Sequence, residues 1–127
     1  MKNLVVLLAL FVPFQLANAD NHGAPNAVTA DPDHYTVEFE NDALRVVRIN
    51  YGAGETSTMH AHDANCVVFL SGGEMTMAFP DGSSSPAPVS TPGEVNCSDA
   101  VVHLPTNSGD SNAEVIMFEL KGRKTVE

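Results

Sequence analysis

The sequence predicts a single all-β domain, built as a sandwich or barrel of short antiparallel strands. Apolar and polar residues alternate with period two in several segments, which is the pattern of half-buried strands. Turn-forming residues recur about every ten residues, as they do in sandwiches and barrels. No segment shows the apolar stripe and the capping residues that mark an amphipathic helix.

The N-terminal residues 1–19 have the three-part layout of a secretory signal peptide. Lys2 supplies the positive charge, residues 4–14 are almost wholly apolar, and Ala17-Asn18-Ala19 matches the small-x-small cleavage pattern. We therefore expect cleavage after Ala19 and a periplasmic or secreted protein with no membrane contact after cleavage. Such a compartment is oxidising and permits disulfides.

Residues 20–34 are rich in Asn, Ala, Pro and Asp and show no periodicity, which predicts a flexible N-terminal arm. His22 and His34 lie in this arm. Together with the new amino terminus they could bind a metal weakly, but solvated histidines are the simpler expectation.

The first half of the predicted barrel, which spans residues 35–121, opens with two strands. Residues 35–40 alternate strictly between apolar and polar side chains, and Asn41-Asp42 predicts a turn. Residues 43–51 are rich in β-branched residues and place Val47, Ile49 and Tyr51 on one face.

The second half continues the alternation. Residues 66–70 form a compact apolar run, and residues 74–79 place Met75 and Met77 on the face where a barrel strand needs core side chains. Four further segments follow: a tight Pro80-Asp81-Gly82 turn, a Ser- and Pro-rich ragged edge or loop over 83–92, one strand over 95–104 and a loop over 105–112. Residues 115–120 close the barrel, and residues 122–127 form a C-terminal tail.

The charge balance limits the partners. The chain has 16 acidic and 6 basic residues and a formal net charge of −10. A nucleic-acid-binding protein needs a basic surface for phosphates, so this class is excluded. We expect a small-molecule ligand or substrate, and a homodimer as the oligomeric state.

Three histidines carry the chemistry that the sequence suggests. His60 and His62 are two residues apart in an expected strand, so both imidazoles lie on one face and can chelate one metal ion. His103 lies in a second strand-like segment, which a barrel can bring beside the first. Three ligands with an open position are the layout of a substrate-accessible metal site.

The spacing around these histidines resembles the two motifs of the cupin superfamily. Gly54, His60, His62 and Gly73 match the first motif, Gly-x5-His-x-His-x3-4-Glu-x6-Gly, with Cys66 in place of the Glu. The second motif is matched at its end, by His103 and Asn107, while its inner Pro-x-Gly is absent. The resemblance covers about residues 35–121 and is closest to small single-domain cupins.

The resemblance implies a cupin-type antiparallel β-barrel, or jelly roll, with a metal ion in its mouth. It implies His60, His62 and His103 as ligands of one divalent transition metal, which could be copper, zinc, iron, nickel or manganese. It does not select a reaction, because the same fold serves several unrelated reactions and pure binding.

Cys66 leaves three alternatives open. As a thiolate it could be the fourth metal ligand, and it is included with the three histidines in the predicted site. It could instead form a disulfide with Cys97, which would leave a three-histidine site. Both cysteines could also be buried thiols that only fill space.

Two arginines and one asparagine are weaker candidates. Arg45 and Arg48 lie on a strand, where an inward arginine could hold a substrate carboxylate, although pairing with surface acids is the commoner arrangement. Asn107 could support His103 by a hydrogen bond or could serve a turn.

The sequence therefore predicts an exported metal-binding cupin. We favour a metal-dependent enzyme of the oxygenase, isomerase or lyase type, acting on a small polar metabolite. The alternative is a non-catalytic periplasmic copper-handling protein, which a closed four-ligand site would favour.

Overall fold

The computed structural model describes residues 23–126 of the chain. The predicted signal peptide and residues 20–22 of the predicted arm lie outside the described residues, so these two predictions are not tested there. In the part that is described, no helix is long and apolar enough to cross a membrane.

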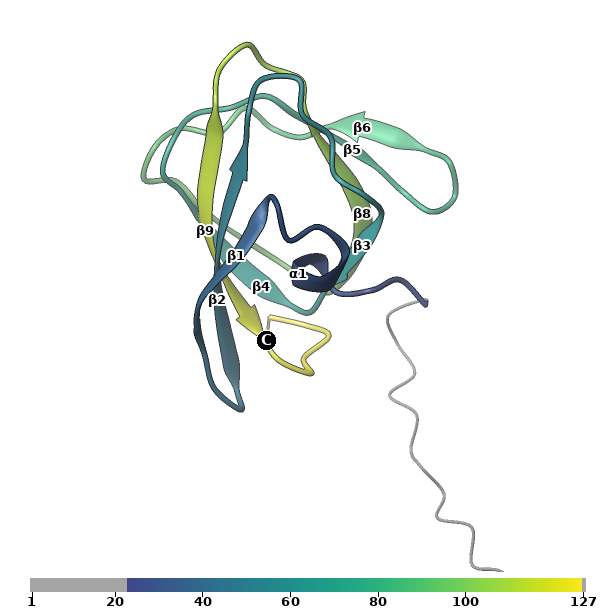
Figure 1. Cartoon of the computed structure of the whole chain (residues 1–127), viewed down its shortest axis with the longest axis vertical. Coiled ribbons are helices and arrows are strands. Elements are labelled where there is room, and N and C mark those ends of the chain that lie inside the picture. The colour runs from purple at the N-terminus through teal and green to yellow at the C-terminus, as the bar shows by residue number, and fades with distance from the viewer. Residues whose placement is uncertain (1–22, 127) are drawn as a thin grey trace, which may run out of the picture.

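The described residues form two antiparallel sheets that face each other across the core (Figure 1). The five-stranded sheet has the order β1 (Tyr35–Glu40), β2 (Leu44–Tyr51), β9 (Ala113–Leu120), β4 (Asn65–Phe69) and β7 (Val95–Ser98). The four-stranded sheet has the order β3 (His60–His62), β8 (Val101–Asn107), β5 (Met75–Ala78) and β6 (Ser84–Pro86). The predicted all-β jelly-roll class is confirmed.

The centre of the core lies on the inner face of β2 and β9. These strands pair over their full length, with Val47 opposite Met117 and Ile49 opposite Val115. Val47 and Met117 are among the largest fully buried side chains of the described chain. The face of β2 that the period-two pattern predicts as apolar is thus the face that is buried.

The segment 95–104 is divided between the two sheets, so the prediction of one strand is wrong. β7 pairs with β4, whereas β8 pairs with β3 and β5. Between them the Ala100 amide donates to the carbonyl of Lys124 at 2.8 Å. Only Asp99 and Ala100 separate the two strands, and neither is a glycine or a proline that would mark a break in the sequence. β8 also extends to Asn107, into the predicted loop.

The described part of the C-terminal tail is attached to the barrel. The Gly122 amide donates to the Asp63 carboxylate at 2.9 Å, and the Ala64 amide donates to the carbonyl of Arg123 at 2.9 Å. The tail therefore lies along the turn between β3 and β4, next to the strand that carries two of the candidate histidines.

Residues 23–34 are not a flexible arm. They contain a single helical turn, α1 (Ala27–Ala30), whose N-cap Asn26 accepts a hydrogen bond from the Val28 amide at 3.2 Å. Ala27 is fully buried, and the Ala61 amide of β3 donates to the Pro25 carbonyl at 2.8 Å. One turn is too short to produce a helical periodicity in the sequence, which is why the pattern indicated an arm.

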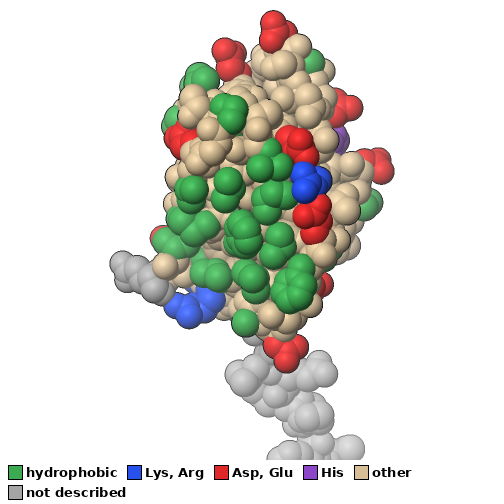
Figure 2. All heavy atoms as spheres, turned by 90° about the vertical axis from the view of Figure 1, so that its left-hand side faces the viewer, with side chains coloured by type: hydrophobic (Ala, Val, Ile, Leu, Met, Phe, Trp, Pro, Cys, Tyr) green, Lys and Arg blue, Asp and Glu red, His purple; other side chains and the backbone are tan. Residues whose placement is uncertain are grey.

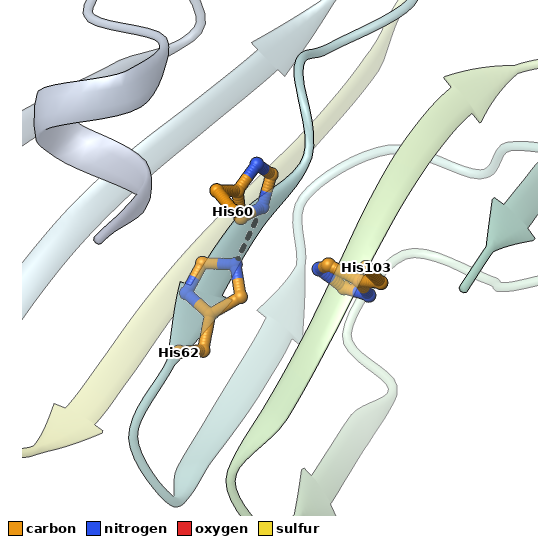
Figure 3. A group of neighbouring side chains, drawn as sticks. All are labelled: His60, His62 and His103. Carbon is orange, nitrogen blue, oxygen red and sulfur yellow. Dashed lines mark hydrogen bonds between the residues drawn. The ribbon is translucent and has the colours of Figure 1, made fainter. Parts of the chain in front are cut away.

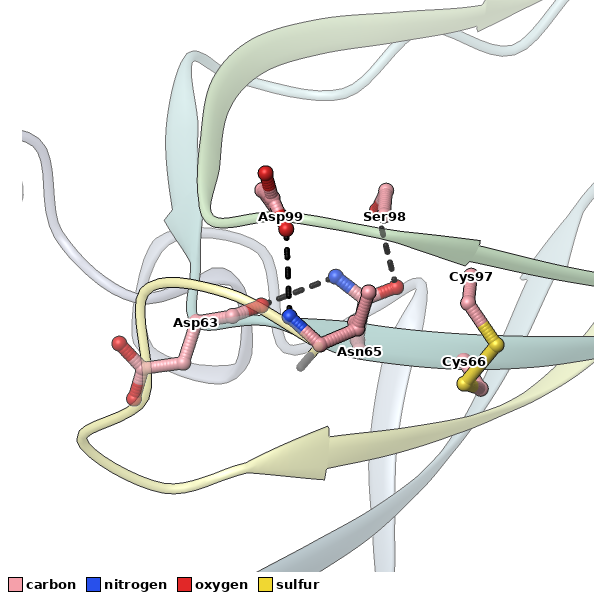
Figure 4. Close-up of a disulfide and its surroundings, with 7 residues drawn as sticks. Asp63, Asn65, Cys66, Cys97, Ser98 and Asp99 are labelled. Carbon is pink, nitrogen blue, oxygen red and sulfur yellow. Dashed lines mark hydrogen bonds between the residues drawn. A yellow bond between two sulfur atoms is a disulfide. The ribbon is translucent and has the colours of Figure 1, made fainter.

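A disulfide joins the last two strands of the five-stranded sheet. Cys66 in β4 lies directly opposite Cys97 in β7, and the two sulfurs are bonded (Figure 4). The neighbours Asn65 and Val67 line the interior cavity, so strand alternation turns Cys66 to the outside of the barrel.

The outer side of the five-stranded sheet is largely apolar. One row of directly paired residues crosses all five strands, and Phe39 and Phe118 in this row are 53% and 37% exposed. Figure 2 faces the side where β9 and β2 lie and shows these side chains gathered into one surface. We call it the outer apolar face, and it comprises Phe39, Leu44, Val46, Cys66, Val68, Val95, Cys97, Ile116, Phe118 and Leu120.

Removing the disulfide should destabilise the barrel without changing its fold. The two cysteines are 31 residues apart, and releasing a loop of this length lowers the free energy of unfolding by about 3–4 kcal/mol. Urea unfolding of the Cys66→Ser/Cys97→Ser variant, compared with the oxidised wild type, measures this loss. The variant should lose no more free energy of unfolding than the wild type loses when a reductant is added. If neither the variant nor the reduced wild type were less stable than the oxidised wild type, the prediction would be contradicted.

Candidate metal centre

The three histidines predicted as ligands lie together at the inner face of the four-stranded sheet. His60 and His62 are on the same face of β3, and His103 of β8 lies directly opposite His60 in the strand pairing. Each ring offers a nitrogen, and the three nitrogens lie within 4.8 Å of one another (Figure 3). His60 and His62 are almost completely buried. The predicted grouping of these three side chains is found in the structure.

The backbone determines which nitrogen of His60 carries the proton. Its Nδ1 lies 2.8 Å from the carbonyl oxygen of Thr58, and a carbonyl can only accept a hydrogen bond. Nδ1 is therefore the protonated nitrogen, and Nε2 presents its lone pair to the centre of the cluster. The Tyr35 hydroxyl lies 3.1 Å from this Nε2, and Tyr51 donates to Tyr35 at 2.8 Å.

His62 is oriented by a buried carboxylate. Its Nδ1 lies 3.6 Å from Oε1 of Glu119, an ion-pair distance longer than a hydrogen bond. A proton on Nδ1, toward the carboxylate, leaves the lone pair on Nε2. A carboxylate behind a histidine in this way is the usual arrangement around metal-bound imidazoles.

The buried nitrogens of the cluster fit a metal ion. Nε2 of His60 and Nε2 of His62 are 3.0 Å apart, and two lone pairs at this distance repel each other unless a proton or a metal ion lies between them. Nε2 of His103 is buried and has no hydrogen-bond partner among the described residues. Buried polar atoms without a partner are rare and costly, so both features fit a cation bound among the three rings.

Burial also keeps two of the imidazoles uncharged. Burial, and after it the neighbouring His62, lower the pKa of His60 to about 4 and that of His103 to about 3. At neutral pH these rings are therefore neutral, which is the form that binds metal ions.

Glu119 itself is held by three groups. Its oxygens accept hydrogen bonds from the Asn26 side chain, the Asp63 amide and Arg45, at 3.1, 3.1 and 3.2 Å. Burial alone raises the pKa of Glu119, but His62, the Asp63 amide and Arg45 outweigh it and lower the pKa below its usual value. The carboxylate is therefore ionised beside the cluster. Because it contacts both His62 and Asn26, the N-cap of α1, it connects α1 to the cluster.

The prediction of Cys66 as a fourth ligand is wrong. Its sulfur is bonded to Cys97, and the side chain faces the outside of the sheet, away from the three histidines. The first cupin motif allows three or four residues between its second His and its Glu. With four residues the Glu position falls on Val67, which does line the cavity. The alternative in which Cys66 and Cys97 pair is the one that the structure bears out, and no side chain that could replace the acidic ligand is grouped with the three described histidines.

The remaining candidates have structural roles. Asn107 is fully buried and donates to the carbonyls of Tyr51, Gly52 and Ser111, so it anchors two loops and does not contact His103. His34 pairs with Asp31 and stacks on Tyr51, apart from the cluster. His22 lies outside the described residues.

Both arginines on β2 pair with acidic side chains. Arg45 contacts Glu40 and Glu119, and Arg48 contacts Glu38 and Glu114. Pairing with acidic side chains, the commoner of the two arrangements expected for these arginines, is therefore the one found. Neither arginine is among the residues that line the interior cavity.

An interior cavity of about 150 Å³ adjoins the cluster, between the two sheets. His62 and His103 form part of its wall, as do the hydroxyl-bearing rings of Tyr35 and Tyr51. The two tyrosines were expected only as strand residues. Their role at the site depends on pairing across the barrel, which a single sequence does not reveal.

Solved structures identify this architecture. A cupin domain from Bordetella pertussis Tohama I superposes with a TM-score of 0.62 and 23% sequence identity, covering 77% of this chain and 96% of that chain. The protein has the cupin fold. A conserved protein with a double-stranded β-helix domain from Klebsiella pneumoniae superposes with a TM-score of 0.53 and 17% identity, covering 83% and 84%.

A cupin superfamily protein from Desulfitobacterium hafniense DCB-2 superposes with a TM-score of 0.50 and 15% identity, covering 68% of this chain and 74% of that chain. Neither a protein-family model nor a curated protein matches the sequence. Likeness at these identities shows the cupin fold, and the function has to be argued from the site itself.

The buried Glu119–Arg45 pair should contribute much more to stability than the exposed half of the same network. Glu119→Ala leaves Arg45 without its buried partner and should lower the free energy of unfolding by about 3–5 kcal/mol. Glu40→Ala removes the exposed partner of the same arginine and should cost far less. Urea denaturation compares the two variants, and equal losses would show that Glu119 is not a structural anchor of the site.

Proposed function

We propose that this cupin-fold protein binds one divalent transition metal ion through His60, His62 and His103. The observation that carries the proposal is the convergence of three imidazole nitrogens: Nε2 of His60 lies 3.0 Å from Nε2 of His62, and Nε2 of His103 is buried without a hydrogen-bond partner among the described residues. Imidazole suits copper, zinc, iron and nickel, and manganese is also compatible with such a site.

The site has the character of a reactive centre more than of a storage site. Three protein ligands leave coordination positions open, and the disulfide removes Cys66 as a fourth ligand. A bound metal would supply Lewis acidity toward an oxygen of the substrate. The protein's own residues hold the imidazoles of His60 and His103 neutral, exclude water with the apolar cavity wall and present the Tyr35 hydroxyl.

We accordingly favour a metal-dependent enzyme of the oxygenase, isomerase or lyase type over a non-catalytic copper-handling protein. The copper-handling alternative depends on soft ligands at the ion. Cys66 is committed to the disulfide, and Met75, Met77 and Met117 belong to the cavity wall, where they pack with other apolar side chains.

We also propose that the protein is exported to the periplasm or secreted. The signal-like N-terminal sequence supports this location, and the Cys66–Cys97 disulfide is the kind of bond that persists in oxidising compartments.

Metal titration tests the proposed site. Calorimetric titration of metal-free wild-type protein with Zn²⁺ should give one ion per chain, and His60→Ala or His103→Ala should weaken binding by at least about 100-fold. Both variants lose a direct ligand of the ion.

Two control variants separate the site from the rest of the chain. His34→Asn removes a histidine outside the cluster, and Cys66→Ser/Cys97→Ser removes both thiols, so each should bind zinc as the wild type does. If the two histidine variants kept wild-type affinity, or the cysteine variant lost it, the three-histidine site would be refuted.

We further propose that two copies of this chain associate through the outer apolar face. At about 4.8 Å between strands and 3.3 Å per residue, the five strands of this sheet, each four to eight residues long, give a face of roughly 500 Å². Standard interfaces bury about 800 Å² on each partner, so the face supplies more than half of the required area.

The charge distribution favours a second copy as the occupant. The chain has a net charge of −10, yet the outer apolar face is formed by uncharged side chains (Figure 2). Arg48, at its margin, is already paired with Glu38 and Glu114. Two copies that associate through this face keep most of their acidic side chains away from each other. A charged partner would meet no side chains of opposite charge on this face.

Sedimentation equilibrium tests this association. The wild type should be a dimer, and Phe118→Glu should be a monomer because it would bury an unpaired charge in the interface. Val89→Glu changes an equally apolar, 67% exposed residue outside the face and should remain dimeric. A monomeric wild type, or a wild type that binds neutral phosphatidylcholine vesicles as a monomer, would contradict the proposal.

A further inference from the structure

The wall of the interior cavity is apolar over most of its area. Aliphatic, aromatic and thioether side chains from both sheets form it, and His62 and His103 are at its edge. The apolar residues of the wall are Ile49, Val67, Phe69, Met75, Met77, Val101, Pro105, Ala113, Val115 and Met117.

Most polar side chains on this wall already have protein partners. Asn65 donates to the Asp63 carbonyl at 2.9 Å, and Ser71 accepts from the Glu114 amide at 2.7 Å. The Glu114 carboxylate pairs with Arg48. A ligand that carried several polar groups would therefore find few partners in the cavity, and each unpaired group would cost binding energy.

The described residues that line the cavity include no lysine or arginine. Arg45 and Arg48, which a carboxylate-binding site would use, are held by acidic side chains elsewhere on the sheet. A charged group buried at the far end of the cavity, away from the histidines, would have no counter-ion.

One polar group on the wall becomes available when the histidines are occupied. In the metal-free cluster the Tyr35 hydroxyl can donate to Nε2 of His60, at 3.1 Å, while it accepts from Tyr51 at 2.8 Å. A metal ion that takes the lone pair of His60 Nε2 removes that acceptor. The Tyr35 proton is then free to be donated to an oxygen atom of a ligand in the cavity.

The volume limits the size of the ligand. A cavity of about 150 Å³ holds a molecule the size of benzene, with about six non-hydrogen atoms. This is smaller than the 300–1,000 Å³ typical of drug-sized ligand pockets.

We propose that the substrate class is a small molecule of about six non-hydrogen atoms with a single polar oxygen on an otherwise apolar skeleton, such as a short ketone or alcohol. The polar oxygen lies at the histidine cluster and accepts from Tyr35, and the body fills the apolar part of the cavity. The inference rests on the proposed metal site for the role of Tyr35, and it replaces the small polar metabolite expected from the sequence with a largely apolar molecule.

A matched pair of ketones tests the class. Pentan-3-one and 1,3-dihydroxyacetone share the central carbonyl and the number of non-hydrogen atoms, but the second carries hydroxyl groups in place of both terminal methyls. Protein labelled with ¹³C at the methionine methyls reports binding, because Met75, Met77 and Met117 line the cavity and Met59 does not.

Pentan-3-one should shift the three cavity methyls and leave Met59 unchanged, in metal-free and in zinc-loaded protein. Dihydroxyacetone should bind at least tenfold more weakly, since its hydroxyls would be buried without partners. Equal or tighter binding of dihydroxyacetone, or no shift of the cavity methyls with pentan-3-one, would overturn the inference.

Tyr35→Phe tests the role of the hydroxyl. In zinc-loaded protein it should weaken pentan-3-one binding about three- to tenfold, and in metal-free protein, where Tyr35 donates to His60, it should have no effect. Tyr51→Phe keeps the Tyr35 proton and should change binding less. An equal effect of Tyr35→Phe in both states would overturn this role.

The metal-free titration keeps this inference separable from the proposed function. If zinc does not bind but pentan-3-one still shifts the cavity methyls selectively, the metal site fails and the ligand class stands. If zinc binds and neither ketone does, the metal site stands and the ligand class fails.

Discussion

The pairing of β3 with β8 is the constraint on which the site depends. It places His60 directly opposite His103, and the two-residue spacing in β3 adds His62 to the same face. A shift of one residue between these strands would place His103 and the two histidines of β3 on opposite faces of the sheet. The register is supported on the other side of β3 by the bond from the Ala61 amide to the Pro25 carbonyl, so the segment around α1 helps to position the histidines.

Charge and burial then determine what the cluster can do. The described cluster has three imidazoles and no acidic ligand, because the disulfide holds Cys66 on the outer side and Val67 takes the inward position. The acid nearest His62 is Glu119, which is ionised behind the ring and held by Arg45. The result is a group of imidazole nitrogens beside a small apolar cavity, with the negative charge of Glu119 behind His62.

The sequence predicted most of the strands, the fold and the three histidines because each depends on local alternation or on motif spacing. It did not predict features that depend on pairing between distant segments. The last strand, β9, carries apolar residues on both faces. Its residue pattern therefore does not predict that Glu119 points inward and Phe118 outward. Three alternatives for Cys66 stayed open because only the pairing of β4 with β7 brings Cys97 opposite. The single turn of α1 was too short to give a signal.

X-ray absorption at the zinc edge of the zinc-loaded protein tests the central claim most directly. The account predicts a first shell of nitrogen and oxygen at about 2.0–2.1 Å, with the outer-shell scattering of three imidazole rings and no sulfur. A sulfur atom at about 2.3 Å, or the signature of fewer than three imidazoles, would contradict a site built from His60, His62 and His103.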